Sequence, residues 1–167
     1  MSFHMHLRAV AESEVQGRDV AWLLDFMGAA WDGDVHKAEY AAGIAESIEK
    51  DFHTVNELCE AGSGHPAGGA AWELPIFGGR VLHDPASPKA PLALLTAAET
   101  RAAAAFLTDV PFATLWESAG ARIHASFGPA WAEEVVRGIY EGHHRDLATF
   151  YGRAAADGRA VIKAFWY

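Results

Sequence analysis

Hydrophobic and polar residues alternate at the start of the chain, and this period of two predicts a strand. The alternating residues are, on the apolar side, Phe3, Met5 and Leu7 and, on the polar side, His4, His6 and Arg8. Residues 159–167, at the other end of the chain, are mostly apolar on both sides, which is typical of a central strand. Because the helices between them need a shared apolar surface to cover, we expect both strands in one sheet.

Helical spacing dominates the first segments between these strands. Residues 13–29 predict one helix, and Asp34 is placed to cap the start of the next helix. That second helix carries an apolar stripe with spacings of three and four residues, and we expect it to run unbroken to a C-terminal cap at Gly62. The stripe consists of Ile44, Ile48, Phe52, Val55 and Cys59.

The second half of the chain predicts three more helices. Thr96 and Glu99 have the spacing of a capping box and open a helix that ends near Asp109. Pro111 suits the first turn of another short helix. The longest helix, residues 131–156, has His143 at the centre of its apolar stripe. We expect this imidazole to be largely buried and hydrogen-bonded, since a buried polar group needs a partner.

Residues 62–91 separate these two halves and are rich in glycine, proline and serine. Two short segments flank Gly78-Gly79 at the spacing of a tight hairpin. The resulting order is strand, helices, hairpin, helices and strand, without the regular alternation of a doubly wound fold. It predicts a single α+β domain over residues 1–167, with several helices packed on one small mixed or antiparallel sheet.

Composition and charge exclude several classes of partner. The 167 residues carry a formal net charge of −9 and no cluster of lysine and arginine, so we expect neither nucleic acid nor a membrane as a partner. The single cysteine, Cys59, cannot form an intramolecular disulfide, and the start of the chain lacks a secretory signal. These features, with the many alanines and arginines, lead us to expect a cytoplasmic, bacterial protein.

One short motif suggests a specific chemistry. GSGHPA, residues 62–67, matches the letters of the G-x-G-x-x-A dinucleotide-binding turn. That turn needs a strand before it and a helix after it, because the N-terminal amides of the helix hold the phosphates. Here a predicted helix ends at the glycines, and Pro66 lacks one of the amide donors. We therefore expect no dinucleotide at residues 62–67.

Five segments together show a family resemblance through their order and spacing. They are IEKDFHTVNEL (48–58), Phe77-Gly78-Gly79, Leu95-Thr96-Ala97-Ala98-Glu99, Ile123-His124 followed by Pro129 and Trp131, and LATFYGRAAADGRAVI (147–162). Over residues 44–165 the chain resembles the YfbM-like family of uncharacterised bacterial proteins, a domain of unknown function numbered 1877. The resemblance implies a compact α+β domain and no settled activity. Asn56 stands where the family commonly has a second histidine, so a site with two histidines on this helix is not expected.

The candidate binding residues would form a polar pocket beside the glycine-rich segment. They are Lys50, His53, Asn56, Trp72 and His143. The first three lie on the polar side of the second helix, and an exposed Trp72 could anchor a partner. The alternative for the first three residues is a solvated helix face with ion pairs between residues four apart. The alternative for Trp72 is a side chain folded over the core. His143 is either a core residue or a general base.

No reaction has its full set of residues at a recognisable spacing. We therefore predict a protein of unknown activity that is a non-catalytic binding or protein-interaction domain, without a cofactor. One version recognises another protein through the acidic surface and residues 62–91. The alternative is a small metal-dependent enzyme in which His4 and His6, on one strand face, bind the metal. Its third ligand would be His53, His65, His83, His143 or a carboxylate, and the spacing does not choose among them.

Overall fold

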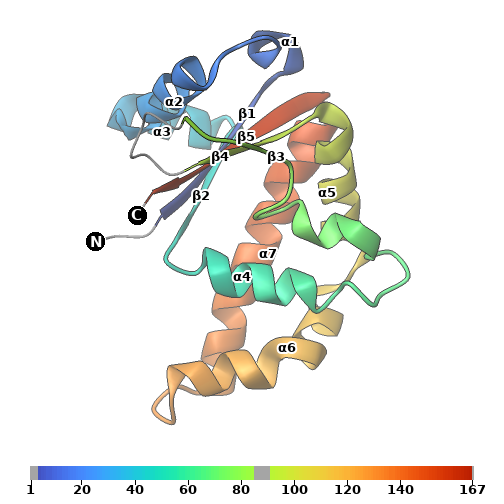
Figure 1. Cartoon of the computed structure of the whole chain (residues 1–167). Coiled ribbons are helices and arrows are strands. Elements are labelled where there is room, and N and C mark those ends of the chain that lie inside the picture. The colour runs from blue at the N-terminus through green and yellow to red at the C-terminus, as the bar shows by residue number, and fades with distance from the viewer. Residues whose placement is uncertain (1–3, 85–90, 167) are drawn as a thin grey trace.

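A five-stranded antiparallel sheet crosses the middle of the molecule (Figure 1). The structure is a computed structural model that describes residues 4–84 and 91–166. In chain order the strands are β1 (His4–Ala11), β2 (Ala45–Glu49), β3 (Arg80–Leu82), β4 (Leu92–Leu95) and β5 (Arg159–Trp166). Their spatial order is β2-β1-β5-β4-β3, and β1 pairs with β5 along its whole length. The prediction that both ends of the chain share one sheet in an α+β domain is confirmed; Phe3 and Tyr167 lie outside the described residues.

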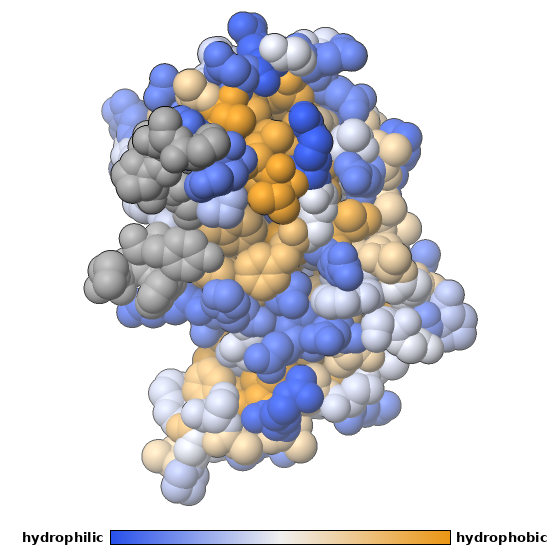
Figure 2. Space-filling view, in the orientation of Figure 1, coloured by the Kyte–Doolittle hydropathy of each residue, from blue (hydrophilic) through white to orange (hydrophobic). Residues whose placement is uncertain are grey.

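Helices cover both faces of this sheet (Figure 1). On one side lie α1 (Glu12–Val15), α2 (Val20–Gly28), the 3-10 turn η1 (Ala29–Trp31) and α3 (Gly33–Ala41). On the other side lie α4 (Phe52–Glu60), the 3-10 turn η2 (Gly69–Glu73), α5 (Ala97–Asp109), α6 (Phe112–Phe127) and α7 (Glu133–Ala156). In the same view, Figure 2 shows an apolar band in the upper middle of the molecule, bordered by hydrophilic side chains.

Two apolar cores result, one on each face of the sheet. The larger core joins Met5, Leu7 and Val161 of the central strands to side chains of α4–α7. The smaller core joins Ile162 and other residues of β4 and β5 to α2, through side chains such as Leu23. The strand β5 is therefore apolar on both faces because it is central, as the sequence predicts.

The polar face of β1 is enclosed and not exposed to solvent. His6 and Arg8 are 3% and 5% exposed. The layer formed by α2, η1 and α3 covers them, so polar side chains of β1 are enclosed between the sheet and a second layer of helices.

Residues 13–29 do not form the single helix that their pattern predicts. The chain breaks at Gly17, whose φ of +76° ends α1, and the carboxylate of Asp19 then caps α2 by accepting from the backbone amide of Trp22. Asp32, not Asp34, caps α3: its carboxylate accepts from the amides of Asp34 and Val35.

The predicted unbroken helix through residues 44–59 is also wrong. Ala45–Glu49 is the strand β2, in which Ile48 lies opposite Met5 of β1, and the chain turns at Lys50, whose φ is +58°. Residues four apart share a face of a strand as well as of a helix, so the spacing of Ile44 and Ile48 fits both structures. Pairing with β1 selects the strand, and only residues 52–60 are helical.

The hairpin predicted at Gly78-Gly79 is not formed. The segment before the glycines contains η2, and β3 pairs instead with β4, across residues 85–90, which lie outside the described part. A Cβ at Gly79 would lie 2.8 Å from the carbonyl oxygen of Leu94, so this glycine lets the chain approach β4 closely.

The helices of the second half agree better with their patterns. The capping box of Thr96 and Glu99 is confirmed, with both reciprocal hydrogen bonds present. The helix after Pro111 is longer than expected, at 16 residues. The structural premise for GSGHPA also holds, because the helix α4 and not a strand precedes the glycines; the absence of a dinucleotide there stays a prediction.

Candidate functional site

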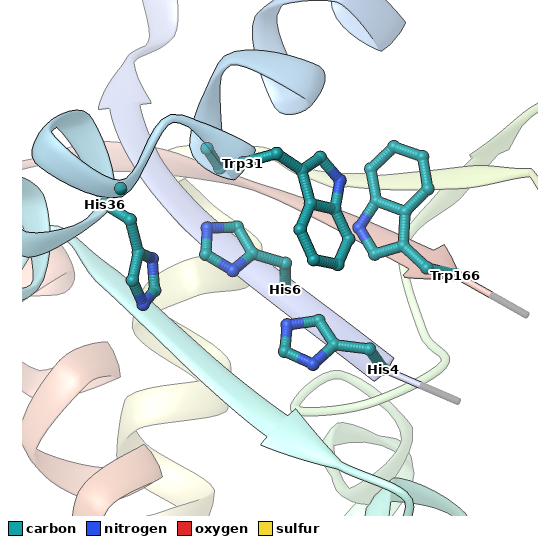
Figure 3. Close-up of a pocket in the computed structure, with 7 residues that line it drawn as sticks. His4, His6, Trp31, His36 and Trp166 are labelled. Atoms are coloured by element: carbon teal, nitrogen blue, oxygen red, sulfur yellow. The ribbon is translucent and has the colours of Figure 1, made fainter. Parts of the chain in front are cut away.

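Three imidazoles and two indoles gather at one end of the central strands (Figure 3). They come from four elements: β1, η1, α3 and β5. Together with two small residues they line a cavity of about 150 Å³, which we call the histidine–tryptophan pocket. Its lining consists of His4, His6, Ala30, Trp31, Gly33, His36 and Trp166.

Strand register and helix capping bring these side chains together. His4 and His6 share a face of β1 because side chains two residues apart point the same way, and Trp166 of β5 lies directly opposite His4. The cap at Asp32 starts α3 immediately after Trp31. One turn into this helix, the ring of His36 lies against that of His6, with 5.2 Å between ring centres.

The tryptophan rings form the other side of the pocket. The ring centre of Trp31 lies 5.4 Å from that of His4 and 5.7 Å from that of Trp166. The planes of the two indoles meet at 68°, so they form two walls of a corner. Trp31 is 61% exposed although it belongs to this cluster, and its indole therefore stands at the rim.

Burial keeps two of the imidazoles neutral. It lowers the pKa of His6 to about 3, with smaller contributions from His36, His4 and Arg8, and it lowers the pKa of His4 against the opposing effect of Glu49. Nε2 of His6 and Nδ1 of His36 are buried, and neither has a hydrogen-bond partner among the described residues. Most buried polar atoms in proteins do have one, so these two nitrogens need an explanation.

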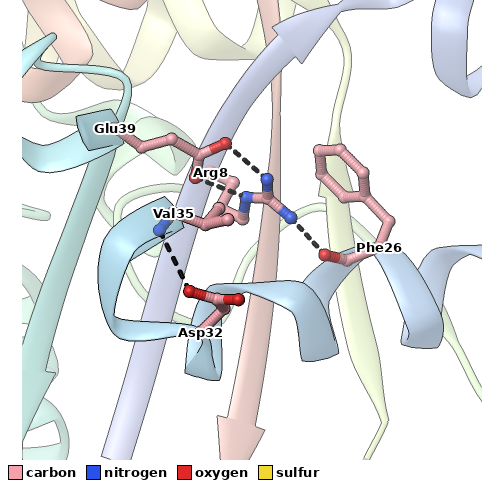
Figure 4. Close-up of polar contacts among 5 residues, drawn as sticks. All are labelled: Arg8, Phe26, Asp32, Val35 and Glu39. Atoms are coloured by element: carbon pink, nitrogen blue, oxygen red, sulfur yellow. Dashed lines mark hydrogen bonds and ion pairs between the residues drawn. The ribbon is translucent and has the colours of Figure 1, made fainter. Parts of the chain in front are cut away.

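A polar clamp holds the helical side of the pocket to the sheet (Figure 4). Arg8 donates from Nε and Nη2 to the two carboxylate oxygens of Glu39, at 2.8 and 2.5 Å, and from Nη1 to the carbonyl oxygen of Phe26. Its guanidinium also stacks on the Phe26 ring, 3.8 Å from the ring centre. The helix α3, all of which is described, buries none of its own side chains. An ion pair and ring contacts therefore attach α3 to the sheet, and the burial of an apolar helix face does not.

A second cavity, of about 220 Å³, lies between β2 and α7. Its lining includes Tyr40, Glu46, Asp146 and Arg153. Burial, and to a lesser degree the neighbouring Asp146, raises the pKa of Glu46. This groove carries charges of both signs, and its aromatic side chains are Tyr40 and Phe150 in place of the indoles and imidazoles of the first cavity.

His143 does not lie in the middle of a buried stripe. It is 24% exposed, and its Nε2 lies 3.6 Å from a carboxylate oxygen of Asp51, at the N-terminus of α4. The apolar stripe of α7 passes beside it through the buried Tyr140 and Leu147. Helical spacing places His143 at the centre of the stripe, because spacing within α7 does not reveal that the polar N-terminus of α4 lies against this histidine.

The remaining predicted pocket residues differ in their surroundings. Lys50 is exposed in the turn before α4, and the exposed His53 lies against the rings of Phe52 and Phe77. Trp72 is half-buried against the larger core, and Asn56 is half-buried on α4. None of the five predicted residues lines the histidine–tryptophan pocket or the cavity between β2 and α7. Their grouping into one site stays a prediction.

The sequence does not identify three of the pocket residues. Trp31 falls in a predicted turn, His36 in a predicted helix, and Trp166 in a predicted strand, and nothing local connects them. The third histidine of the cluster with His4 and His6 is His36, whose ring lies against that of His6. His36 is not among the expected third metal ligands. Within residues 4–84 and 91–166, no group of three or more histidine, cysteine or acidic residues has the geometry to hold a metal ion. No helix in this part of the chain is long and apolar enough to cross a membrane.

Comparison with known proteins agrees with this fold. The chain is similar to the crystal structure of YfbM from Escherichia coli, a protein of unknown function, with a TM-score of 0.57 and 15% identity over 97% of this chain and 99% of that chain. At this identity the likeness shows the fold alone. No curated protein sequence matches the chain. A family model described as a domain of unknown function (DUF1877) matches residues 1–164, and the chain therefore belongs to this family.

Proposed function

We propose that this protein is a non-catalytic binding domain whose ligand occupies the histidine–tryptophan pocket. One observation carries the proposal: His6 and His36, which have buried, unpartnered ring nitrogens, line the same pocket as the exposed indole of Trp31. Leaving a buried nitrogen unsatisfied costs about 1–3 kcal/mol. A bound group that offers a hydrogen-bonding atom would remove this cost, and a rigid exposed tryptophan is a common anchor in binding sites.

The chemistry of the pocket supports binding in preference to catalysis. An imidazole with a pKa of about 3, such as that of His6, is a poor general base at neutral pH, because efficient bases have a pKa near the working pH. The side chains that line the pocket include no carboxylate, hydroxyl or thiol. Cys59 is buried in the larger core, where burial raises its pKa to about 12, so it does not supply a thiolate nucleophile.

The ligand of this proposal is either a small molecule or a side chain of another protein in the bacterial cytoplasm. A cavity of this volume holds a group about the size of a benzene ring. The free thiol of Cys59 fits a reducing compartment.

A thermal-shift screen of soluble small molecules against the purified protein tests the proposal. We expect compounds that raise the melting temperature of the wild type and lose this effect in Trp31→Ala. Trp131→Ala is the matched control, because Trp131 is a second exposed tryptophan, at 46%, that does not line the pocket. Compounds that stabilise the wild type and Trp31→Ala equally would contradict the proposal. Metal analysis of the same preparation addresses the alternative enzyme, which requires near-stoichiometric zinc, iron or manganese.

A further inference from the structure

We infer that the histidine–tryptophan pocket takes a quaternary ammonium group, carried by a small organic cation with a neighbouring hydroxyl. This inference rests on the proposed function and adds the chemical class of the ligand. It follows from the shape of the aromatic walls, from the charge around them and from the hydrogen-bonding capacity of the lining.

The walls have the shape that an alkylated ammonium requires. Two indole planes at 68°, with ring centres 5.7 Å apart, form a corner, and the ring of His4 continues the wall beside Trp31. A cation within about 6 Å of such ring centres is attracted by their negative faces, and tryptophan gives the strongest attraction of the aromatic side chains. The cavity is also large enough for a nitrogen bearing several methyl groups.

The charge around the pocket favours a cation over an anion. Of the described residues, none that lines the pocket is lysine or arginine, and His4 and His6 are neutral near pH 7. Glu49 lies directly opposite His4 on the neighbouring strand and acts on it electrostatically. Asp32 and Asp34, at the start of α3, add negative charge next to Trp31 and Gly33, while the nearby Arg8 is paired with Glu39.

The hydrogen-bonding capacity of the lining distinguishes a quaternary ammonium from a primary amine. A quaternary nitrogen has no N–H to satisfy, so a lining without carboxylates or hydroxyls does not penalise it. A primary ammonium would bring three N–H donors, more than the two unpartnered ring nitrogens of His6 and His36 can accept. The unpartnered nitrogens of His6 and His36 suit the hydroxyl of a ligand, which both donates and accepts.

Isothermal titration calorimetry with choline, tetramethylammonium and 3,3-dimethylbutan-1-ol tests this inference. The alcohol has the shape and hydroxyl of choline without the charge, and tetramethylammonium has the charge without the hydroxyl. We expect saturable binding in the order choline, tetramethylammonium, alcohol, with choline at least about tenfold tighter than the alcohol. In Trp31→Leu and Trp166→Leu the affinity for choline should fall about tenfold, Trp31→Phe should retain more of it, and Trp131→Leu should leave it unchanged.

Three results would overturn the inference. If choline and the alcohol bind equally, the pocket selects shape and not charge, and the proposed binding function stands without this ligand class. If choline binds with undiminished affinity to Trp31→Leu, its site lies elsewhere. If neither cation binds at its highest usable concentration, the ligand belongs to another class, and the thermal-shift screen still decides whether the pocket binds anything.

Discussion

The two faces of the central sheet each bury a cationic side chain, and they hold it in different ways. Arg8 points toward α2 and α3 and donates to both carboxylate oxygens of Glu39. Lys163 points toward the opposite layer and is completely buried. Its Nζ donates to the backbone carbonyl oxygens of Leu74 and Gly78, at 2.6 Å each, and no carboxylate is within ion-pair distance among the described residues.

This difference follows from the chemistry of the two side chains. Arginine stays charged under all physiological conditions, so burying it requires a counter-charge. Lysine can release its proton, and burial lowers the pKa of Lys163 to about 7, although Glu99 acts in the opposite direction. The face toward α4–α7 therefore holds its cationic side chain with carbonyl oxygens and a lowered pKa, and the face toward α3 pairs its cation with a carboxylate.

The comparison also separates two modes of packing. Where α4 meets its neighbours the contacts are tight: a Cβ at Gly62 would lie 2.8 Å from the side chain of Leu115. In the opposite layer, Gly28 and Gly33 have no such neighbour within 4 Å. On the pocket side, the smaller apolar core holds α2, whereas α3 depends on polar and ring contacts, and segments with little apolar burial open most easily.

Breaking the pair on the pocket side should have the largest effect. Arg8→Met leaves Glu39 without its partner, and we expect a loss of about 3 kcal/mol in the free energy of unfolding, measured by urea denaturation. Arg145→Met is the matched control, since Arg145 is exposed and its pair with Asp146 lies on the surface, where a pair contributes at most about 1 kcal/mol. Equal losses in the two variants would show that the clamp does not hold the layer.

A methyl group at Gly62 tests the tightness of the opposite layer. Gly62→Ala forces the new Cβ against Leu115 and Phe106, and we expect a loss of about 2 kcal/mol through overpacking. Gly64→Ala, in the same turn, meets nothing within 4 Å and should change stability much less. Chemical denaturation of both variants gives the comparison, and a harmless Gly62→Ala would mean that this layer yields as easily as the other.

The pH dependence of stability should reveal the lowered pKa of Lys163. Its pKa is lower in the folded state than in the unfolded state, so the unfolded chain binds more protons between pH 7 and 9, and stability rises with pH. The wild type should gain about 2 kcal/mol over this range from Lys163. Lys163→Met should lack this gain. Cys59 titrates in the unfolded chain near the upper end of this pH range, but its effect on stability is the same in both proteins. Parallel pH profiles would show that Lys163 keeps its proton when buried.

On the pocket side, His6 should produce a smaller effect of the same kind at acid pH. Burial, with smaller contributions from His36, His4 and Arg8, lowers the pKa of this imidazole to about 3, so the unfolded chain binds more protons below pH 6.5. Its contribution is present above that pH and decreases as the pH falls toward 3. We expect a loss of about 1–2 kcal/mol between pH 6.5 and 5 that His6→Phe reduces. An identical acid profile in His6→Phe would contradict the burial of a neutral imidazole.

Local patterns in the sequence determine a large part of this fold. The strands at the two ends, the capping box of Thr96 and Glu99 and the long helix α7 are visible because their signals lie within a few residues of each other. The order of the predicted strands and helices gives the α+β class, and the family motifs imply the same class. The break at Gly17 and the strand β2 were not predictable, because the same spacing of apolar residues fits more than one backbone conformation.

Only the tertiary structure creates the pocket and the burial of its polar groups. His4 and His6 are adjacent by strand period alone, but Trp31, His36 and Trp166 reach them from three other elements. The sequence shows Arg8 as one polar residue of an alternating strand, and the packing of α2 and α3 makes it a buried cation. Periodicity records which side a residue faces along its own element, whereas burial and pKa depend on what another element places against that side.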